Sequence, residues 1–337
     1  MKALLTIAVI FYANCISAQT DSAQYYFKKG MDEKNARRYQ VASGYFDKAI
    51  KFDTNLTDAY IENGRVNLEM RRIDAAQGYF TKAYQLQPGN SAVIKELTSL
   101  YFNNRQFQKA IDLASKCNCP EADRIIGMSS YNTEDYNKAV TLLQKYVAKN
   151  PNDAEALYTI GRSLLEQEDY KNAVPWYVRA VTADNTKNVW MYELGLLYNN
   201  VNDDVNSLKY FKMAGDAGYT KSNDYLENIG FAYLNTGDVE NGLKNLQSVL
   251  QRIPDSRELL TLIAGSLYTA KKYDDALDFY QKLVMLDPKN ASALYMAGMS
   301  FQKKGDKERG KAMCDKAIEI DPSLAVNKKK MGESFGL

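Results

Sequence analysis

A small residue that recurs about every 34 positions constrains the fold of this chain more than any other feature. The spacing is 34 residues in six of eight intervals, 29 residues in the third and 35 residues in the sixth. An internal period of this length is typical of folds in which each repeat packs mainly on its neighbours. The recurring residues are Gly30, Gly64, Thr98, Gly127, Gly161, Gly195, Gly230, Ala264 and Gly298.

Each repeat also carries residues at helical spacings. Twelve positions after Gly30 comes a second small residue, Ala42, followed by the large Phe46 and the small Ala49. Positions separated by four and seven residues lie on one face of an α-helix. Turn signals such as "NTGD", which begins at Asn235, separate the two helices of a repeat. The pattern therefore predicts two antiparallel helices in each repeat, which approach closely at the small residues.

The second helices of several repeats share a motif. It reads "GYFDKAIKFD" from Gly44, "ALDFYQKLVMLDP" from Ala276 and "GKAMCDKAIEIDP" from Gly310. In this motif the chain resembles the tetratricopeptide repeat family. The resemblance implies an all-α fold, a right-handed superhelical solenoid of about nine helix-turn-helix repeats of 34 residues.

The spacing also predicts how the chain is divided. We expect a signal peptide at 1–18, an N-terminal block of three repeats at 19–119, a C-terminal block of six repeats at 120–324 and a capping segment at 325–337. The boundary between the two blocks is placed where the third repeat lost five residues. The capping segment is polar and rich in lysine, as a cover for the last apolar face would be.

The first residues predict export from the cytoplasm. Lys2 precedes an apolar stretch of ten residues, Ala3–Tyr12, and Ala18 stands just before a plausible cleavage site. Ten residues are too few to span a bilayer, which favours a cleaved signal over an anchor. The expected location is periplasmic, outer-membrane-associated or extracellular, and the composition resembles that of envelope proteins from Bacteroidota. The alternative is a lipoprotein signal that uses Cys15.

Composition lowers the expectation of an enzyme. The chain has no histidine, which is the commonest general base and metal ligand. With 43 Lys and Arg against 41 Asp and Glu, its net charge of +2 provides no strong field for nucleic acid. We expect a non-enzymatic interaction scaffold of a cell-envelope complex, with no cofactor, metal or catalytic residue. The alternative is an accessory protein or enzyme that acts on envelope glycans through an aromatic-lined groove, since tyrosine is abundant, with 25 residues.

The resemblance implies that the first helix of each repeat lines a concave, partner-binding face. Tyrosine and arginine are favoured at interfaces, and the cations would suit an acidic or C-terminal peptide. The alternative is that the aromatic residues pack between first helices and the cations are solvated. The candidate partner-binding residues are Arg65, Lys95, Phe102, Arg124, Tyr131, Tyr158, Arg162 and Tyr192.

Two cysteines mark the shortened repeat. Cys117 and Cys119 flank one residue at the end of its second helix. Within a helix, residues two apart point in nearly opposite directions and cannot bridge. We expect packing and turn roles for both cysteines, with a disulfide or a reactive thiol as the alternative.

Overall fold

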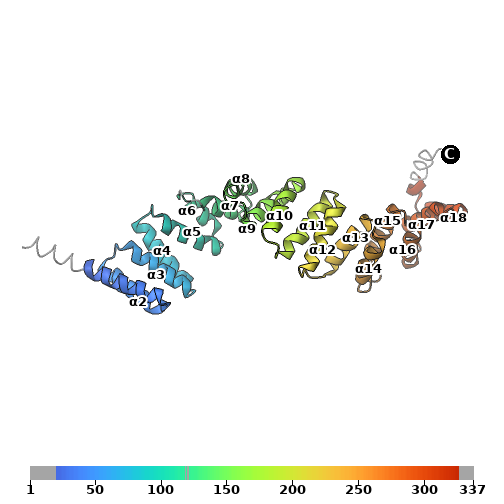
Figure 1. Ribbon diagram of the computed structural model, residues 1–337. Helices are drawn as coiled ribbons and strands as arrows, with labels where there is room; N and C mark the ends of the chain where they lie inside the picture. Colours follow the sequence, from blue (N-terminus) through green and yellow to red (C-terminus); the bar gives the residue numbers. More distant parts are fainter. Residues whose placement is uncertain (1–19, 118, 120, 326–337) are drawn as a thin grey trace, which may run out of the picture. The chain divides into compact units, whose positions relative to one another are not determined.

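The computed structural model describes residues 20–117, 119 and 121–325 of this chain. These residues form α-helices and one short 3-10 helix, and no β-strand occurs among them (Figure 1). The prediction of an all-α solenoid of helix pairs is confirmed. The expected signal peptide, Cys15 and residues 326–337 of the capping segment lie outside the described part of the chain.

First and second helices alternate along the described part of the chain, one of each for every one of the nine repeats. The first helices are residues 20–35, α3 (Thr57–Glu69), α5 (Ser91–Asn103), α7 (Ala122–Asn132), α9 (Ala154–Leu165), α11 (Asn188–Asn200), α13 (Asn223–Asn235), α15 (Arg257–Thr269) and α17 (Ala291–Lys303). The second helices are α2 (Tyr39–Phe52), α4 (Ile73–Leu86), α6 (Phe107–Ala114), α8 (Tyr136–Val147), α10 (Tyr170–Ala183), α12 (Asp204–Asp216), α14 (Val239–Leu250), α16 (Tyr273–Leu286) and α18 (Lys307–Ile320). The 3-10 helix η1 (Pro322–Leu324) follows α18.

Contacts group the chain into two compact units, Met1–Gln167 and Glu168–Leu337. We call them unit 1 and unit 2. Unit 1 contains the helices from residue 20 to α9, and unit 2 contains α10 to η1. The two blocks expected on either side of residue 119 follow from repeat spacing, and that division stays a prediction.

Glycine at the recurring small position lets the two helices of a repeat interlock. A Cβ atom on Gly64 of α3 would lie 2.7 Å from Cε1 of Phe80 in α4, and the same relation holds between Gly195 and Phe211 at 2.6 Å. Such distances are far inside van der Waals contact, so a side chain there would force the helices apart. The predicted close approach at the small residues is confirmed.

The turn between the two helices of a repeat uses a left-handed residue each time. Glycine supplies it at Gly237 and Gly305, but arginine, glutamate, asparagine or lysine takes this conformation in the other repeats. At Arg71, with φ 57°, the next N–H group, that of Arg72, donates to the carbonyl of Asn67 at 2.8 Å. This closes the helix C-terminus with a Schellman-type hydrogen bond. The turn geometry is therefore set by the repeat and is imposed on residues that do not favour it.

Within a unit, neighbouring repeats share buried clusters. In unit 1, Tyr60 of α3, Phe80 of α4 and Leu97 of α5 belong to one buried cluster. The hydroxyl of Tyr79 in α4 donates to Oδ1 of Asp47 in α2 at 2.7 Å, so polar contacts also join neighbouring repeats. Burial of such apolar side chains is the main force that holds a repeat stack together.

The longer sixth interval arises in a turn between repeats. The sequence suggests a shift near Asn202–Asn206, but α12 begins in register, with Asp203 as its N-cap. The additional residue lies after α12, in the turn where Gly218 has φ 85°. That turn also holds Tyr219, whose ring stacks on that of Tyr192.

Candidate partner-binding surface

The eight candidate residues all lie on first helices, as expected from the repeat pattern. Seven of them belong to unit 1 and Tyr192 belongs to unit 2. Arg65 lies on α3, Lys95 and Phe102 on α5, Arg124 and Tyr131 on α7, and Tyr158 and Arg162 on α9. We call the solvent-facing side of these helices the first-helix face.

The cations of the first-helix face in unit 1 are paired with carboxylates. Arg65 donates from Nη1 to Glu62 at 2.6 Å and from Nε to Glu96, on the first helix of the next repeat, at 2.8 Å. Lys95 on α5 pairs with Glu121, just before α7, at 3.1 Å. These pairs make a ladder that runs from one repeat to the next.

Arg124 forms the most extensive rung of this ladder. Its Nε donates to Oδ2 of Asp153 at 2.7 Å, and its Nη2 donates to Glu155 at 3.1 Å. Burial opposes the charge of Asp153, but hydrogen bonds from Arg124 and the Ala156 N–H group outweigh it and hold the pKa of Asp153 below its usual value. Burial likewise opposes the charge of Arg124, but its two carboxylate partners raise the pKa of Arg124.

Arg162 has a partner within its own helix. Its Nη2 donates to Glu166, four residues further along, at 2.8 Å. The four cations were predicted from the sequence, but their acidic partners were not. The signal was present, because a carboxylate follows Arg65, Lys95 and Arg124 after 26–31 residues, close to one repeat length.

Three of the four candidate aromatic residues pack on rings of their own chain. The ring centroids of Phe102 and Phe107 are 5.7 Å apart in an edge-on arrangement, and those of Tyr131 and Tyr136 are 5.9 Å apart. These two pairs join the end of a first helix to the start of the second. The fourth, Tyr158, is half-buried.

Tyr192 in unit 2 is buried, with 9% exposure. Its ring stacks on that of Tyr219 with centroids 4.4 Å apart, and its hydroxyl accepts from Nδ2 of Asn228 at 2.8 Å. Tyr225 packs beside both rings, and its hydroxyl donates to the Phe211 carbonyl at 3.0 Å. Tyr192 therefore belongs to an aromatic cluster that fills the space between repeats.

A groove that the sequence analysis missed lies on unit 2. It encloses about 600 Å³, and uncharged side chains of α15 form most of its wall. The groove is unoccupied at Gly265, because a Cβ atom added to this residue would meet no other atom within 4 Å. Leu262 beside it is 51% exposed. The lining residues are Asp204, Leu234, Asn235, Thr261, Leu262, Gly265, Ser266, Thr269 and Ala270.

Acidic side chains lie along the helices that form this groove. Glu258 precedes Thr261 by one turn of α15, and Asp204 lines the groove itself. Burial raises the pKa of Glu227 on α13, and the charges of Asp224 and Glu258 raise it further. Acidic side chains therefore flank a mostly uncharged groove on unit 2, whereas the cations of the first-helix face of unit 1 are paired with carboxylates.

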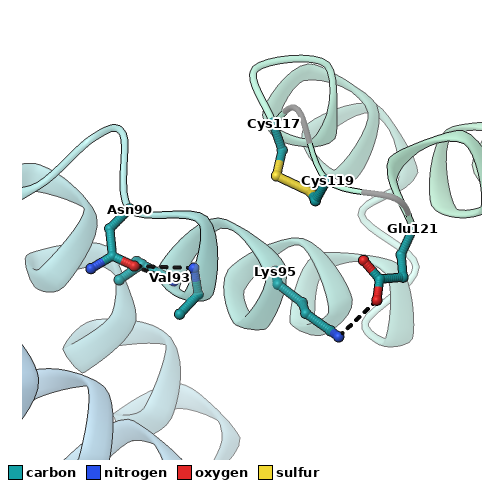
Figure 2. Close-up of a disulfide and its surroundings, with 7 residues drawn as sticks. Asn90, Val93, Lys95, Cys117, Cys119 and Glu121 are labelled. Carbon is teal, nitrogen blue, oxygen red and sulfur yellow. Dashed lines mark hydrogen bonds and ion pairs between the residues drawn. A yellow bond between two sulfur atoms is a disulfide. The ribbon is translucent and has the colours of Figure 1, made fainter.

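Cys117 and Cys119 form a disulfide, with Cα atoms 5.2 Å apart (Figure 2). The expected packing and turn roles, without a bond, are therefore wrong for this pair. The helical argument against a bridge does not apply, because α6 ends at Ala114, before either cysteine. Cys314, in unit 2, is a buried free thiol.

Among the described residues, no three histidine, cysteine, aspartate or glutamate side chains gather in a way that could hold a metal ion. None of the helices in this part of the chain is both long and apolar enough to cross a membrane.

Comparison with known families identifies the repeats. Models described as tetratricopeptide repeat match residues 126–188, 229–293 and 291–324. Curated proteins with a similar segment include mitochondrial import receptor subunit TOM70 from Homo sapiens and from Rattus norvegicus, each 29% identical over 99 residues. The alignment covers 29% of this chain and 16% of each TOM70 chain, so it concerns a small part of those receptors.

Solved structures with similar repeats include YrrB, described as a TPR protein with an unusual peptide-binding site. It is 24% identical, with a TM-score of 0.42 over 56% of this chain and 97% of its own. The C-terminal part of a TPR repeat-containing protein from Cytophaga hutchinsonii is 19% identical, with a TM-score of 0.44 over 67% of this chain and 95% of its own. At these values the alignments support no inference about what this chain binds.

Proposed function

Because this chain is a tetratricopeptide repeat protein, we propose that it binds a partner protein on the first-helix face of unit 2 and has no catalytic activity of its own. Tetratricopeptide repeats imply a protein–protein interaction scaffold. The observation that carries the choice of site is the groove at Gly265, which is open to solvent and is lined mostly by uncharged residues. The partner segment is proposed to be a peptide with small or apolar side chains that enter the groove.

Charge gives the proposed peptide a further property. Neither Glu227 nor Glu258 forms an ion pair with a cation among the described residues. The two carboxylates repel each other, and a positively charged partner would relieve this repulsion. A lysine or arginine beside the apolar side chains of the peptide would therefore stabilise the complex. The proposed peptide is therefore basic, whereas the cations of unit 1 led us to expect an acidic one. Those cations already have acidic partners within the chain.

A bulky substitution in the groove tests the proposed site. In Gly265→Trp the new side chain has room on the surface and fills the groove, and helix α15 loses a flexible glycine. Gly44→Trp on α2 is the matched control, because a Cβ atom there also meets nothing within 4 Å. Partners are recovered from cells by cross-linking and purification and are quantified by mass spectrometry.

We expect Gly265→Trp to lose most of the partner that Gly44→Trp retains. Equal recovery with both variants would contradict the groove as the binding site. A triple variant, in which Arg124, Tyr158 and Arg162 are replaced by alanine, tests the face of unit 1 in the same assay. Loss of the partner in the triple variant alone would move the site to unit 1.

Export to an oxidising compartment of the cell envelope is part of the same proposal. The N-terminal apolar segment supports it, and so does the disulfide, since such bonds persist outside the reducing cytosol. Mass spectrometry of the chain purified from cells tests it. A mature chain that begins at Gln19 is expected, a lipid-modified chain that begins at Cys15 would establish the lipoprotein alternative, and an intact Met1 would contradict export.

A further inference from the structure

The connection between α6 and α7 is the longest between two repeats of unit 1. Helix α6 has only eight residues, the fewest of any described α-helix, and ends at Ala114. Seven residues, 115–121, then lead to α7. In this connection the Cys117–Cys119 disulfide closes a loop of minimal length.

The two cysteines pack on different parts of the core. Cys117 contacts the cluster that contains Leu97, Leu100 and Leu113, which belongs to the second and third repeats. Cys119 contacts the cluster that contains Ile111 and Ile126, which joins the third and fourth repeats. The bond between their sulfur atoms therefore ties two neighbouring core clusters together.

The third repeat departs from the packing pattern of the other repeats. In the third repeat Thr98 replaces the usual glycine and Ala114 replaces the usual large residue, so the two helices lack the glycine–aromatic interlock. The hydroxyl groups of Thr98, Ser129 and Ser130 are buried and have no hydrogen-bond partner among the described residues. Each unsatisfied buried hydroxyl destabilises the surrounding structure. The disulfide is therefore a covalent constraint next to a junction that contains unsatisfied buried groups.

We propose that the Cys117–Cys119 disulfide is a redox modification site, which a dithiol reductant opens and which then loosens the junction of the third and fourth repeats. In the first step a thiolate of the dithiol attacks one sulfur atom, the S–S bond breaks and a mixed disulfide forms. The second thiolate of the dithiol then attacks the mixed disulfide. Two electrons pass to the chain, Cys117 and Cys119 each end as a thiol, and the reductant ends as a disulfide.

Both cysteines are only half-buried, so a reductant reaches them without unfolding of the unit. The effect is local, because a closed loop of so few residues constrains the unfolded chain little. Reduction therefore changes the order of α6 and α7 far more than it changes the overall unfolding temperature.

The first-helix face lies close to this site. Glu121, two residues after Cys119, precedes α7 and pairs with Lys95 on α5 at 3.1 Å (Figure 2). That ion pair and the N–H group of Glu121 itself lower the pKa of Glu121. When the bond opens, the position of Glu121 is less constrained, so the spacing of the first helices in the third and fourth repeats becomes sensitive to redox state.

Hydrogen exchange measured by mass spectrometry tests the proposal on the chain from Gln19 to Leu337. The oxidised chain should give one free thiol after denaturation, that of Cys314, and the chain treated with dithiothreitol should give three. Amides of α6 and α7 should exchange about tenfold faster in the reduced chain, whereas those of α3, α4 and unit 2 should be unchanged. Equal exchange in both forms, or three free thiols before reduction, would overturn the proposal.

Two variants separate the disulfide from other effects of the reductant. The double variant Cys117→Ala, Cys119→Ala should show the fast exchange of α6 and α7 without reductant and should not respond to it. Cys314→Ala, in unit 2, should keep the full response. The test requires no partner protein, so its outcome is independent of the proposed binding function.

Discussion

Arg124 on α7 donates a hydrogen bond from Nε to Oδ2 of Asp153 at 2.7 Å, and Asp153 is the N-cap of α9 in the next repeat. The Asp153 side chain also accepts from the Ala156 N–H group at 3.0 Å. One carboxylate thus caps a helix and ties two repeats together. Removal of its cation should weaken both functions, and the size of the effect should depend on pH.

Arg124→Ala is expected to lower the free energy of unfolding by about 1–2 kcal/mol at pH 7, because a half-buried carboxylate loses its partner. The depressed pKa of Asp153 in the folded state gives stability that is present above the ordinary aspartate pKa and is lost as pH falls through the folded value. The difference between variant and wild type should therefore shrink below about pH 4. Urea unfolding at pH 7 and pH 3 measures it, and an equal difference at both would contradict this account.

Gly64→Ala should destabilise the second repeat, because its Cβ atom would lie 2.7 Å from Phe80. We expect a loss of about 1–3 kcal/mol in thermal or urea unfolding. Gly265→Ala is the matched control, since its Cβ atom meets no other atom and alanine favours the helix by about 1 kcal/mol. Effects of the same sign at the two glycines would show that helix propensity, and not the interlock, controls these positions.

Lys271→Gly should stabilise unit 2, because Lys271 has φ 61° in the turn between α15 and α16. A non-glycine residue in the left-handed region loses roughly 1–2 kcal/mol, part of which is offset by the greater freedom of glycine when unfolded. Gly305→Ala, with φ 99° at the equivalent turn, should have the opposite effect. Calorimetry of both variants measures whether the unfolding temperature rises in Lys271→Gly and falls in Gly305→Ala. Destabilisation by Lys271→Gly would contradict the turn argument.

Tyr79→Phe removes the hydrogen bond to Asp47 and should lower stability by about 1 kcal/mol at pH 8. Burial, followed by the hydrogen bond to Asp47 and its charge, raises the pKa of Tyr79 to about 12. The folded state then keeps a proton that the unfolded state loses, so the wild type loses stability as pH rises from about 10 towards about 12. The gap between variant and wild type should narrow over that range in urea unfolding. A constant gap would contradict the raised pKa.

The fold was predictable because the repeat period arises from the close packing of the two helices in each repeat. Gly30, Gly64 and Gly195 face large side chains of the following helix, and a Cβ atom there would lie within 3 Å of them, so small residues recur at this position and the pattern is visible in the sequence alone. The positions of the candidate residues on first helices followed from the same period. The ion pairs were harder to predict from the sequence. Arg65 pairs with Glu96 on the next repeat, and which of several nearby acidic residues an arginine contacts depends on its side-chain rotamer.

Two features, the groove at Gly265 and the Cys117–Cys119 disulfide, could not be predicted from the sequence pattern. The groove beside Gly265 depends on what neighbouring helices leave empty, and a glycine inside a helix does not reveal whether it faces a neighbour or solvent. The Cys117–Cys119 bond was missed because the second helix was expected to continue to Cys117, whereas α6 ends at Ala114. Helix ends are set by tertiary packing and are poorly fixed by local sequence.

Site-specific photo-cross-linking in cells tests the proposed binding site most directly. A photoreactive amino acid replaces Leu262, which is 51% exposed in the groove, or Met285 on α16, which is 81% exposed and lies outside it. The account predicts a discrete cross-linked partner protein from position 262 and none above background from position 285. No adduct at position 262, or the same adducts at both positions, would contradict it.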